Sequence, residues 1–294
     1  MGRYWQPTQW PFRAVCVAGS GDIKVPRVSA IAAADSERTE HLRRSRACAV
    51  LGIIIVGAIA WWFVIASDAQ MVAMSGAGVL GALMRAMMQP EVTVPYLAAT
   101  ALMWVAMMTA MMTPAVLPVV ITFWRLDRGG ETQRITDGIL FSASYLVVWC
   151  GFGLAMTALQ WALHSHSVLA LPVLAATPQL AASLVIVAGV YQLTPFKTTC
   201  LAHCRTPLGF LLSHWRSGSL GAMRMGLAHG SYCLGCCWAL MLVMFAGGVM
   251  SFSVMALVSG LILTERLLPG GPWVSKLPGV VLITLGGWLM SPYV

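Results

Sequence analysis

Long apolar stretches alternate with short clusters of charged residues along this chain. Five stretches contain no Asp, Glu, Lys or Arg, and they are 21, 33, 59, 40 and 18 residues long. A helix needs roughly 20 apolar residues to cross the ~30 Å hydrocarbon layer of a membrane. The two longest stretches therefore hold two helices each, and we place the breaks between His164 and Pro178 and at Gly247 and Gly248. The pattern predicts about seven spans, at approximately 47–66, 97–122, 138–161, 178–193, 222–245, 249–264 and 278–293.

Basic residues fall almost entirely on one side of such a topology. With the N-terminus in the cytoplasm, 17 of the 18 Lys and Arg residues lie in cytoplasmic segments, and Arg85 alone lies outside. Cytoplasmic loops of membrane proteins carry an excess of Lys and Arg. The sequence therefore predicts an all-α, polytopic transmembrane helix bundle of the bacterial inner (plasma) membrane, with its N-terminus inside and its C-terminus outside.

Composition agrees with this pattern. Hydrophobic residues make up 59% of the chain and charged residues 10%, with a mean hydropathy of +0.79. Soluble domains contain about 25% charged residues, so a soluble enzyme and a disordered protein are excluded. The net charge of +8 is accounted for by the one-sided distribution of basic residues. The expected partner is therefore the lipid bilayer, and no nucleic acid is needed to explain the charge.

Two segments differ from the apolar spans. Residues 1–46 are polar and basic, which predicts a disordered cytoplasmic tail, or alternatively a tail that lies on anionic lipid. Residues 70–88 are moderately apolar but contain Arg85, and we expect an external interfacial segment there. The transmembrane helical domain then covers residues 47–294, with a Cys/His motif at 200–237.

Cysteine and histidine gather in one part of the chain, where five of the eight cysteines lie within 38 residues. On a helix, at about 100° per residue, one face carries His229, Cys233, Cys236 and Cys237, with methionines above and below them. Thiolate and thioether ligands select Cu(I), and thiolates with imidazole also suit zinc. The face predicts a metal site, and the alternative is a helix interface packed by small polar residues.

Two further groups are candidate auxiliary ligands. Cys200 and Cys204 flank a histidine just after the predicted fourth span. We expect this segment to be either a mobile loop that hands over metal or a pair of ligands that closes the site from below. Met107 and Met111 repeat at helical spacing in the second span, at the same expected depth as Cys233. The alternative for the methionines is a packed or lipid-facing stripe.

The remaining polar residues have simpler interpretations. His164 and His166 are expected in a solvated external loop. Glu265 and Arg266 are expected to form a charge pair at the membrane interface, at the inner end of the predicted sixth span.

Three motifs together resemble a bacterial family of predicted metal-binding integral membrane proteins. They are W-x-A-M-M-x-A-M-M-x-P at 104–114, T-P-x-K-x-x-C-L-x-x-C-R-x-P at 194–207 and H-G-x-Y-C-L-G-C-C-W-A-L-M at 229–241, and the family is catalogued as domain of unknown function 2182. The resemblance implies a multi-helix membrane protein that binds metal, sometimes labelled a copper chaperone, with no established reaction. Ser251 and Arg266 depart from the family pattern, and we expect neither to touch a proposed ligand.

Three functions follow from these observations. The first is copper transport or delivery, in which the ion, as Cu(I) with zinc as the alternative, passes to a metallochaperone or metalloenzyme recipient. The second is a membrane thiol-disulfide oxidoreductase using Cys233 and Cys236. The third is a structural subunit of a membrane complex. We identify no catalytic residue, which favours a protein that is not an enzyme.

Overall fold

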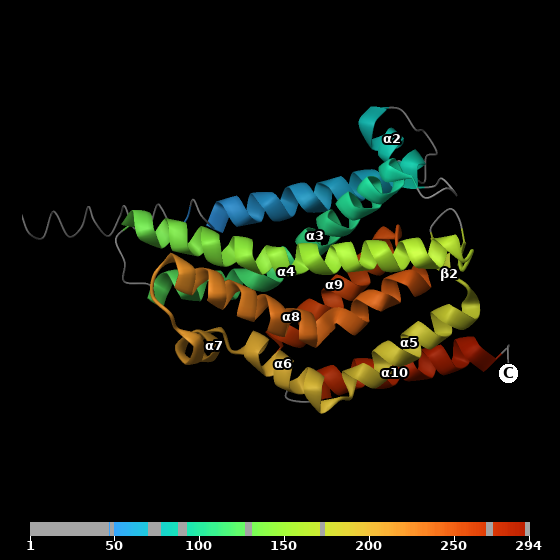
Figure 1. Ribbon diagram of the computed structural model, residues 1–294. Helices are drawn as coiled ribbons and strands as arrows, with labels where there is room; N and C mark the ends of the chain where they lie inside the picture. Colours follow the sequence, from blue (N-terminus) through green and yellow to red (C-terminus); the bar gives the residue numbers. More distant parts are fainter. Residues whose placement is uncertain are drawn as a thin grey trace, which may run out of the picture. The chain divides into compact units, whose positions relative to one another are not determined.

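The computed structural model describes residues 47, 50–69, 78–87, 93–126, 131–170, 174–268 and 273–291. The expected tail at 1–46 lies outside these ranges. The described residues are helical apart from short connections and one two-stranded hairpin (Figure 1). The helices are Val50–Ala69, α2 (Gly78–Met87), α3 (Val94–Leu126), α4 (Glu131–Ser165), α5 (Pro178–Gln192), α6 (Pro195–Arg205), α7 (Pro207–His214), α8 (Ser219–Gly247), α9 (Phe252–Leu267) and α10 (Trp273–Met290).

The all-α prediction is confirmed, whereas the seven predicted spans are not supported. In the described residues, four helices are long and apolar enough to cross a membrane: Val50–Ala69, α3, α4 and α8. A fifth is added if α5 and α6 count as one span, since a 67° bend separates them. The predicted sixth span is the 16-residue α9, and the apolar part of α10 is shorter than 18 residues. Hydropathy located these helices, but α5, α9 and the apolar part of α10 are each too short to count as a span on their own.

Both predicted breaks in the longest apolar stretches are confirmed. The α4 helix ends at Ser165, and α5 begins at Pro178, whose ring suits the first turn of a helix. Between them, β1 (Leu169–Ala170) pairs antiparallel with β2 (Ala175–Ala176). The α8 helix ends before Gly248, which has a φ of +96° that favours glycine. Ser251 then caps α9 by accepting a hydrogen bond from the backbone of Val254.

The α8 helix packs against α4, α5, α6 and α9. Glycines allow the close approach of α4, because a Cβ atom on Gly226 would lie 2.3 Å from the carbonyl oxygen of Phe141. A Cβ atom on Gly230 would lie 2.9 Å from Val148. Small residues let helix backbones approach closely in membrane proteins. The consequence here is that the middle of α8 is enclosed by neighbouring helices.

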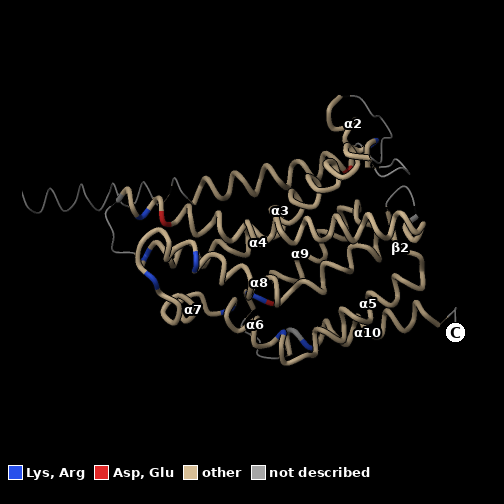
Figure 2. Tube along the Cα trace, in the orientation of Figure 1, with Lys and Arg blue, Asp and Glu red and all other residues tan. Residues whose placement is uncertain are grey.

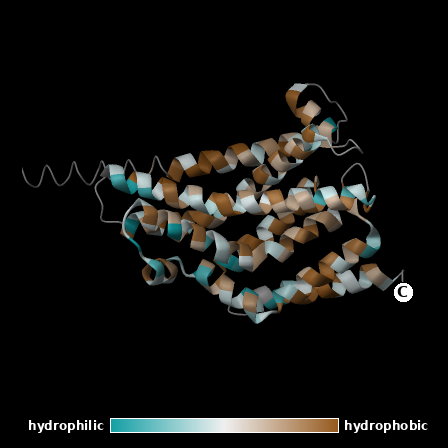
Figure 3. Ribbon diagram, in the orientation of Figure 1, coloured by the Kyte–Doolittle hydropathy of each residue, from teal (hydrophilic) through white to brown (hydrophobic). Residues whose placement is uncertain are grey.

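Charge and apolar surface are distributed unevenly over the helices. Lys and Arg gather at the end where α4 and α8 begin and around α6 and α7 (Figure 2). Between their ends, the helices are predominantly hydrophobic (Figure 3). Large apolar side chains are exposed along them, including Trp62, Val147, Leu257 and Trp288. The outer faces of these helices are therefore apolar.

Candidate metal site: a buried thiol cluster

The predicted face of α8 is buried. His229, Cys233, Cys236 and Cys237 lie on α8, and each is at most 2% exposed. Met225 and Met244, the thioether residues predicted on the same face, are buried as well. The sequence pattern therefore predicted both the helix and the face that turns inward. We call Cys204, Cys233, Cys236 and Cys237 the thiol cluster.

Cys204 reaches this cluster from another helix. It lies on α6, and its Sγ atom is 3.9 Å from the Sγ atom of Cys236. Cys200 is one turn earlier on α6, where a Cβ atom on Gly235 would lie 2.9 Å from its Sγ. Because both cysteines are buried on a helix, the expectation of a mobile loop is wrong. The other expectation, a pair that closes the site, agrees with the position of Cys204.

Arg266 lies directly against the sulfur atoms. Its Nη2 atom donates to Cys233 Sγ at 2.8 Å and lies 3.4 Å from Cys236 Sγ and 4.0 Å from Cys237 Sγ. The side chain is buried, and within the described residues its Nε and Nη1 atoms have no hydrogen-bond partner. The expectation that Arg266 touches no proposed ligand is therefore wrong. The sequence does not show how α9 packs on α8, and its pattern therefore predicts only an interfacial position for this residue.

Glu265 does not pair with Arg266 as expected. Its Oε2 atom forms a salt bridge of 2.6 Å with Lys197 Nζ, and the two side chains are 3% and 0% exposed. Its Oε1 atom accepts from Gln192 at 2.8 Å, and Arg205 Nε donates to its main-chain oxygen. Neighbouring residues on a helix point in different directions, about 100° apart. The last turn of α9 therefore binds α6 through Glu265 and the thiol cluster through Arg266.

Aromatic residues complete the surroundings of the cluster. Tyr145 of α4 forms a hydrogen bond of 3.0 Å with Cys233 Sγ. The ring of His229 packs among Phe141, Tyr145 and Phe210, with centroid distances of 6.3, 5.7 and 4.9 Å. Both ring nitrogens of His229 are buried and have no hydrogen-bond partner in the part of the chain that the structure describes. A buried imidazole without a partner is unusual, and it leaves two nitrogens available to a ligand.

The predicted methionine ligands lie at a different depth along the helix axes from the thiol cluster. Met107 and Met103 of α3 line a small cavity together with Met250, Met255 and Asp68, near the start of α9. Arg266 lies eleven positions after Met255 on α9, which corresponds to about 16 Å along the helix axis. Met111 is one turn further along α3 and is also buried. The methionine cavity and the thiol cluster are therefore separate features.

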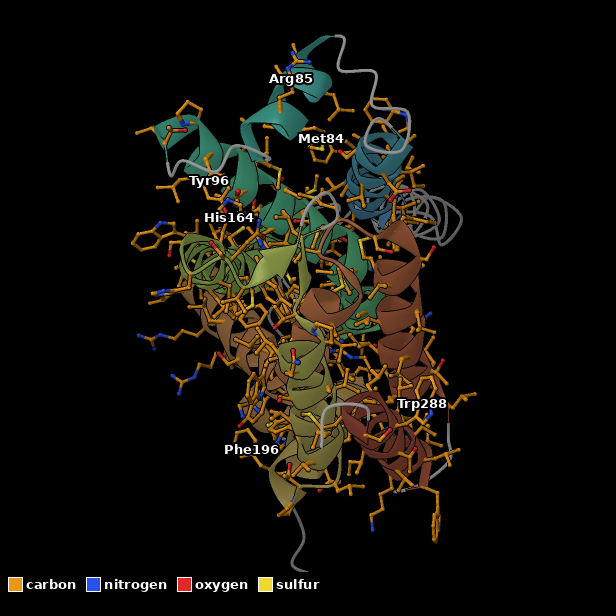
Figure 4. All side chains as sticks on the ribbon, turned by 90° about the vertical axis from the view of Figure 1, so that its right-hand side faces the viewer. Met84, Arg85, Tyr96, His164, Phe196 and Trp288 are labelled. Carbon is orange, nitrogen blue, oxygen red and sulfur yellow. The ribbon has the colours of Figure 1, made fainter. Side chains whose placement is uncertain are left out.

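Other histidines lie at the two ends of the helices. His203 stacks on Tyr232 with a centroid distance of 4.2 Å, near His214. His164 is in the last turn of α4, where its ring stacks on Tyr96 at 5.6 Å (Figure 4). The expected solvated loop therefore starts after His164.

The cluster favours a site with few ligands. Over the described ranges, no group of three or more His, Cys, Asp or Glu side chains is arranged to hold a metal ion. A pair of ligands is nevertheless present. The sulfur atoms of Cys204 and Cys236 lie 3.9 Å apart, which is less than twice a metal–sulfur bond of about 2.3 Å. One ion can therefore contact both sulfurs.

Two residues that contact the thiol cluster, Tyr145 and Arg266, are not predicted by the Cys/His pattern of the sequence. Neither belongs to the Cys/His pattern, and each comes from a helix other than α8. A signal existed for Arg266, because an ionisable residue beside a predicted span is a candidate functional residue. No comparable signal marked Tyr145.

Comparison with known proteins agrees with a copper-related role. The family model PpoB2, described as copper chaperone, matches residues 101–289. No curated protein and no solved structure matches the chain significantly. The matched region runs from α3 to α10 and includes every residue of the thiol cluster. The chain therefore belongs to the PpoB2 copper chaperone family.

Proposed function

We propose that this protein is a membrane-embedded copper chaperone that binds Cu(I) in the thiol cluster and passes it to a recipient protein. Cys204 and Cys236 are the primary ligands, and Cys233, Cys237 and His229 surround them as exchange partners. The observation that carries the proposal is the 3.9 Å separation of two buried sulfurs from different helices. Buried cysteines brought together in this way have the softness that Cu(I) prefers.

The choice of Cu(I) over zinc rests on the number of ligands. Structural zinc sites almost always have four ligands, whereas two thiolates are enough for Cu(I). The described residues contain a close pair of sulfurs but no arranged group of three or more ligands. Membership of a copper chaperone family favours the same ion.

A membrane location explains the outer surface. Exposed Trp62, Leu257 and Trp288 would be costly in water but are suited to lipid. The basic residues at the end where α4 and α8 begin (Figure 2) support a cytoplasmic location for that end. In this orientation Cys200 and Cys204 lie in the half of the bundle that is nearer the cytoplasm.

Transfer would proceed by exchange of ligands along α6 and α8. Cys200 lies one helical turn from Cys204 and packs beside Gly235 of α8. An ion held by Cys204 and Cys236 can exchange one sulfur for Cys200 without becoming free. The methionines, including Met107 and Met111, would act as auxiliary thioether ligands at a separate level.

The test is the copper content of purified variants. The wild-type protein, extracted in detergent under reducing conditions, should bind Cu(I), and Cys204→Ser with Cys236→Ser should lose it. Cys150→Ser is the matched control, because Cys150 lies on α4 outside the cluster. Retention of copper by the double variant at the wild-type level would contradict the proposed ligands.

The close sulfur pair also supports a second candidate function. Two thiols 3.9 Å apart can join in a disulfide after a small movement, as a thiol-disulfide oxidoreductase requires. This function predicts a wild-type protein without copper whose Cys204 and Cys236 become linked when a quinone is added as oxidant. Mass spectrometry of the alkylated protein distinguishes the two functions.

A further inference from the structure

Arg266 brings a permanent positive charge into contact with the thiol cluster. Its Nη2 atom lies 2.8 Å from Cys233 Sγ and 3.4 Å from Cys236 Sγ, and the side chain is 8% exposed. Arginine stays protonated in proteins. A buried guanidinium is costly unless negative charge lies nearby. The charge of Arg266 therefore forms part of any site built from these sulfurs.

The other buried acids of the described residues have partners of their own. Lys197 and Glu265 form a salt bridge of 2.6 Å and cancel each other. Asp137, the remaining buried acid of the described residues, accepts a hydrogen bond from Ser219 near the start of α8. Arg266 instead directs its guanidinium to sulfur, so its compensating charge has to come from thiolates.

The sum of charges in the loaded site depends on the metal. Two thiolates contribute −2 and Arg266 contributes +1, so a monovalent cation brings the total to zero. A divalent cation leaves an excess charge of +1 in the same buried position. Uncompensated charge in a buried site is unfavourable, and the neutral combination is preferred.

We propose that Arg266 sets the metal specificity of the thiol cluster, by selecting a soft monovalent cation over a soft divalent cation. The inference rests on the proposed function and adds the feature that distinguishes the ions. Softness is shared by monovalent and divalent thiophilic metals, so sulfur ligands alone do not separate them. The charge contributed by Arg266 does.

The experiment compares two soft ions of different charge, Ag(I) and Cd(II), on the full chain in detergent. Competition between them gives a ratio of affinities for wild type, Arg266→Gln and Arg266→Lys. Loss of the charge in Arg266→Gln should shift the ratio toward Cd(II) at least tenfold, whereas Arg266→Lys should keep a ratio near that of wild type. Arg224→Gln removes an exposed charge from α8, the helix that carries Cys233 and Cys236, and should leave the ratio unchanged. Arg266→Met serves as a second uncharged variant if Arg266→Gln does not fold, because its apolar side chain buries no polar group without a partner.

A purely structural role for Arg266 gives a different result. If it only holds α9 against α8, the uncharged variants lose affinity for both ions in parallel and the ratio stays constant, which overturns the proposal. A shift in Arg266→Lys as large as in the uncharged variants also overturns it, because the charge is then not the determinant. Failure of the proposed function is distinguishable, because the wild-type protein would then bind neither Ag(I) nor Cu(I).

Discussion

The buried salt bridge between Lys197 and Glu265 should stabilise the position of α6 beside the thiol cluster. We consider Glu265→Gln, which keeps the shape of the side chain and an oxygen that can accept from Gln192. The change removes the negative charge and leaves Lys197, which is 0% exposed, without its counter-charge. The perturbation therefore isolates the ionic part of the interaction.

The magnitude follows from burial. Removing one partner of a buried ion pair costs about 3–5 kcal/mol, because the other charge stays buried and unpaired. An exposed pair would be worth only about 0–1 kcal/mol. With both side chains at most 3% exposed, we expect Glu265→Gln and Lys197→Met each to lower the free energy of unfolding by about 3 kcal/mol or more. The double variant should be close to wild type, because replacing both charges removes the desolvation cost.

The assay is a double-mutant cycle on the detergent-extracted protein, with unfolding followed by denaturant titration. Cu(I) affinity of the same four proteins reports whether α6 still presents Cys204 to the cluster. Single variants that lose less than about 1 kcal/mol, or losses that simply add in the double variant, would refute this account of the salt bridge.

Three further predictions concern packing, the methionines and topology. Gly226→Ala should destabilise the protein by about 1–3 kcal/mol, because the new Cβ would lie 2.3 Å from the Phe141 carbonyl oxygen. Gly151→Ala, in open space on α4, should not destabilise it. If denaturant titration gives the two variants equal stability, the close approach of α4 and α8 is contradicted. Met107→Leu with Met111→Leu conserves volume and should change unfolding by under about 1.5 kcal/mol. It should slow Cu(I) loading in stopped-flow measurements without changing the final copper content, and a lower final content would instead make the methionines direct ligands of the cluster. Reporter fusions after Arg134 and Ser217 should score cytoplasmic and a fusion after Val168 external, and any reversal of these scores would overturn the orientation.

The sequence alone determined the helical class and the inward face of α8. Helical periodicity is fixed by backbone geometry, so His229, Cys233, Cys236 and Cys237 had to share a face wherever a helix formed. Helix-breaking residues likewise marked the start of α5 at Pro178 and the end of α8 at Gly248. These features depend on interactions between residues close in sequence.

Tertiary structure decided the contacts between helices. Cys204 meets Cys236 because the 67° bend redirects α6 and because Gly235 lets it approach α8. Arg266 reaches the sulfurs because α9 packs on α8 in one particular register, which neither helix encodes in its own periodicity. Hydropathy predicted seven spans because it measures apolar length in sequence, whereas helix ends are set by caps and bends such as those at Ser251 and between α5 and α6. The candidate ligands were readable from spacing, but the charge that lies against them comes from a distant segment and appears only when the helices are assembled.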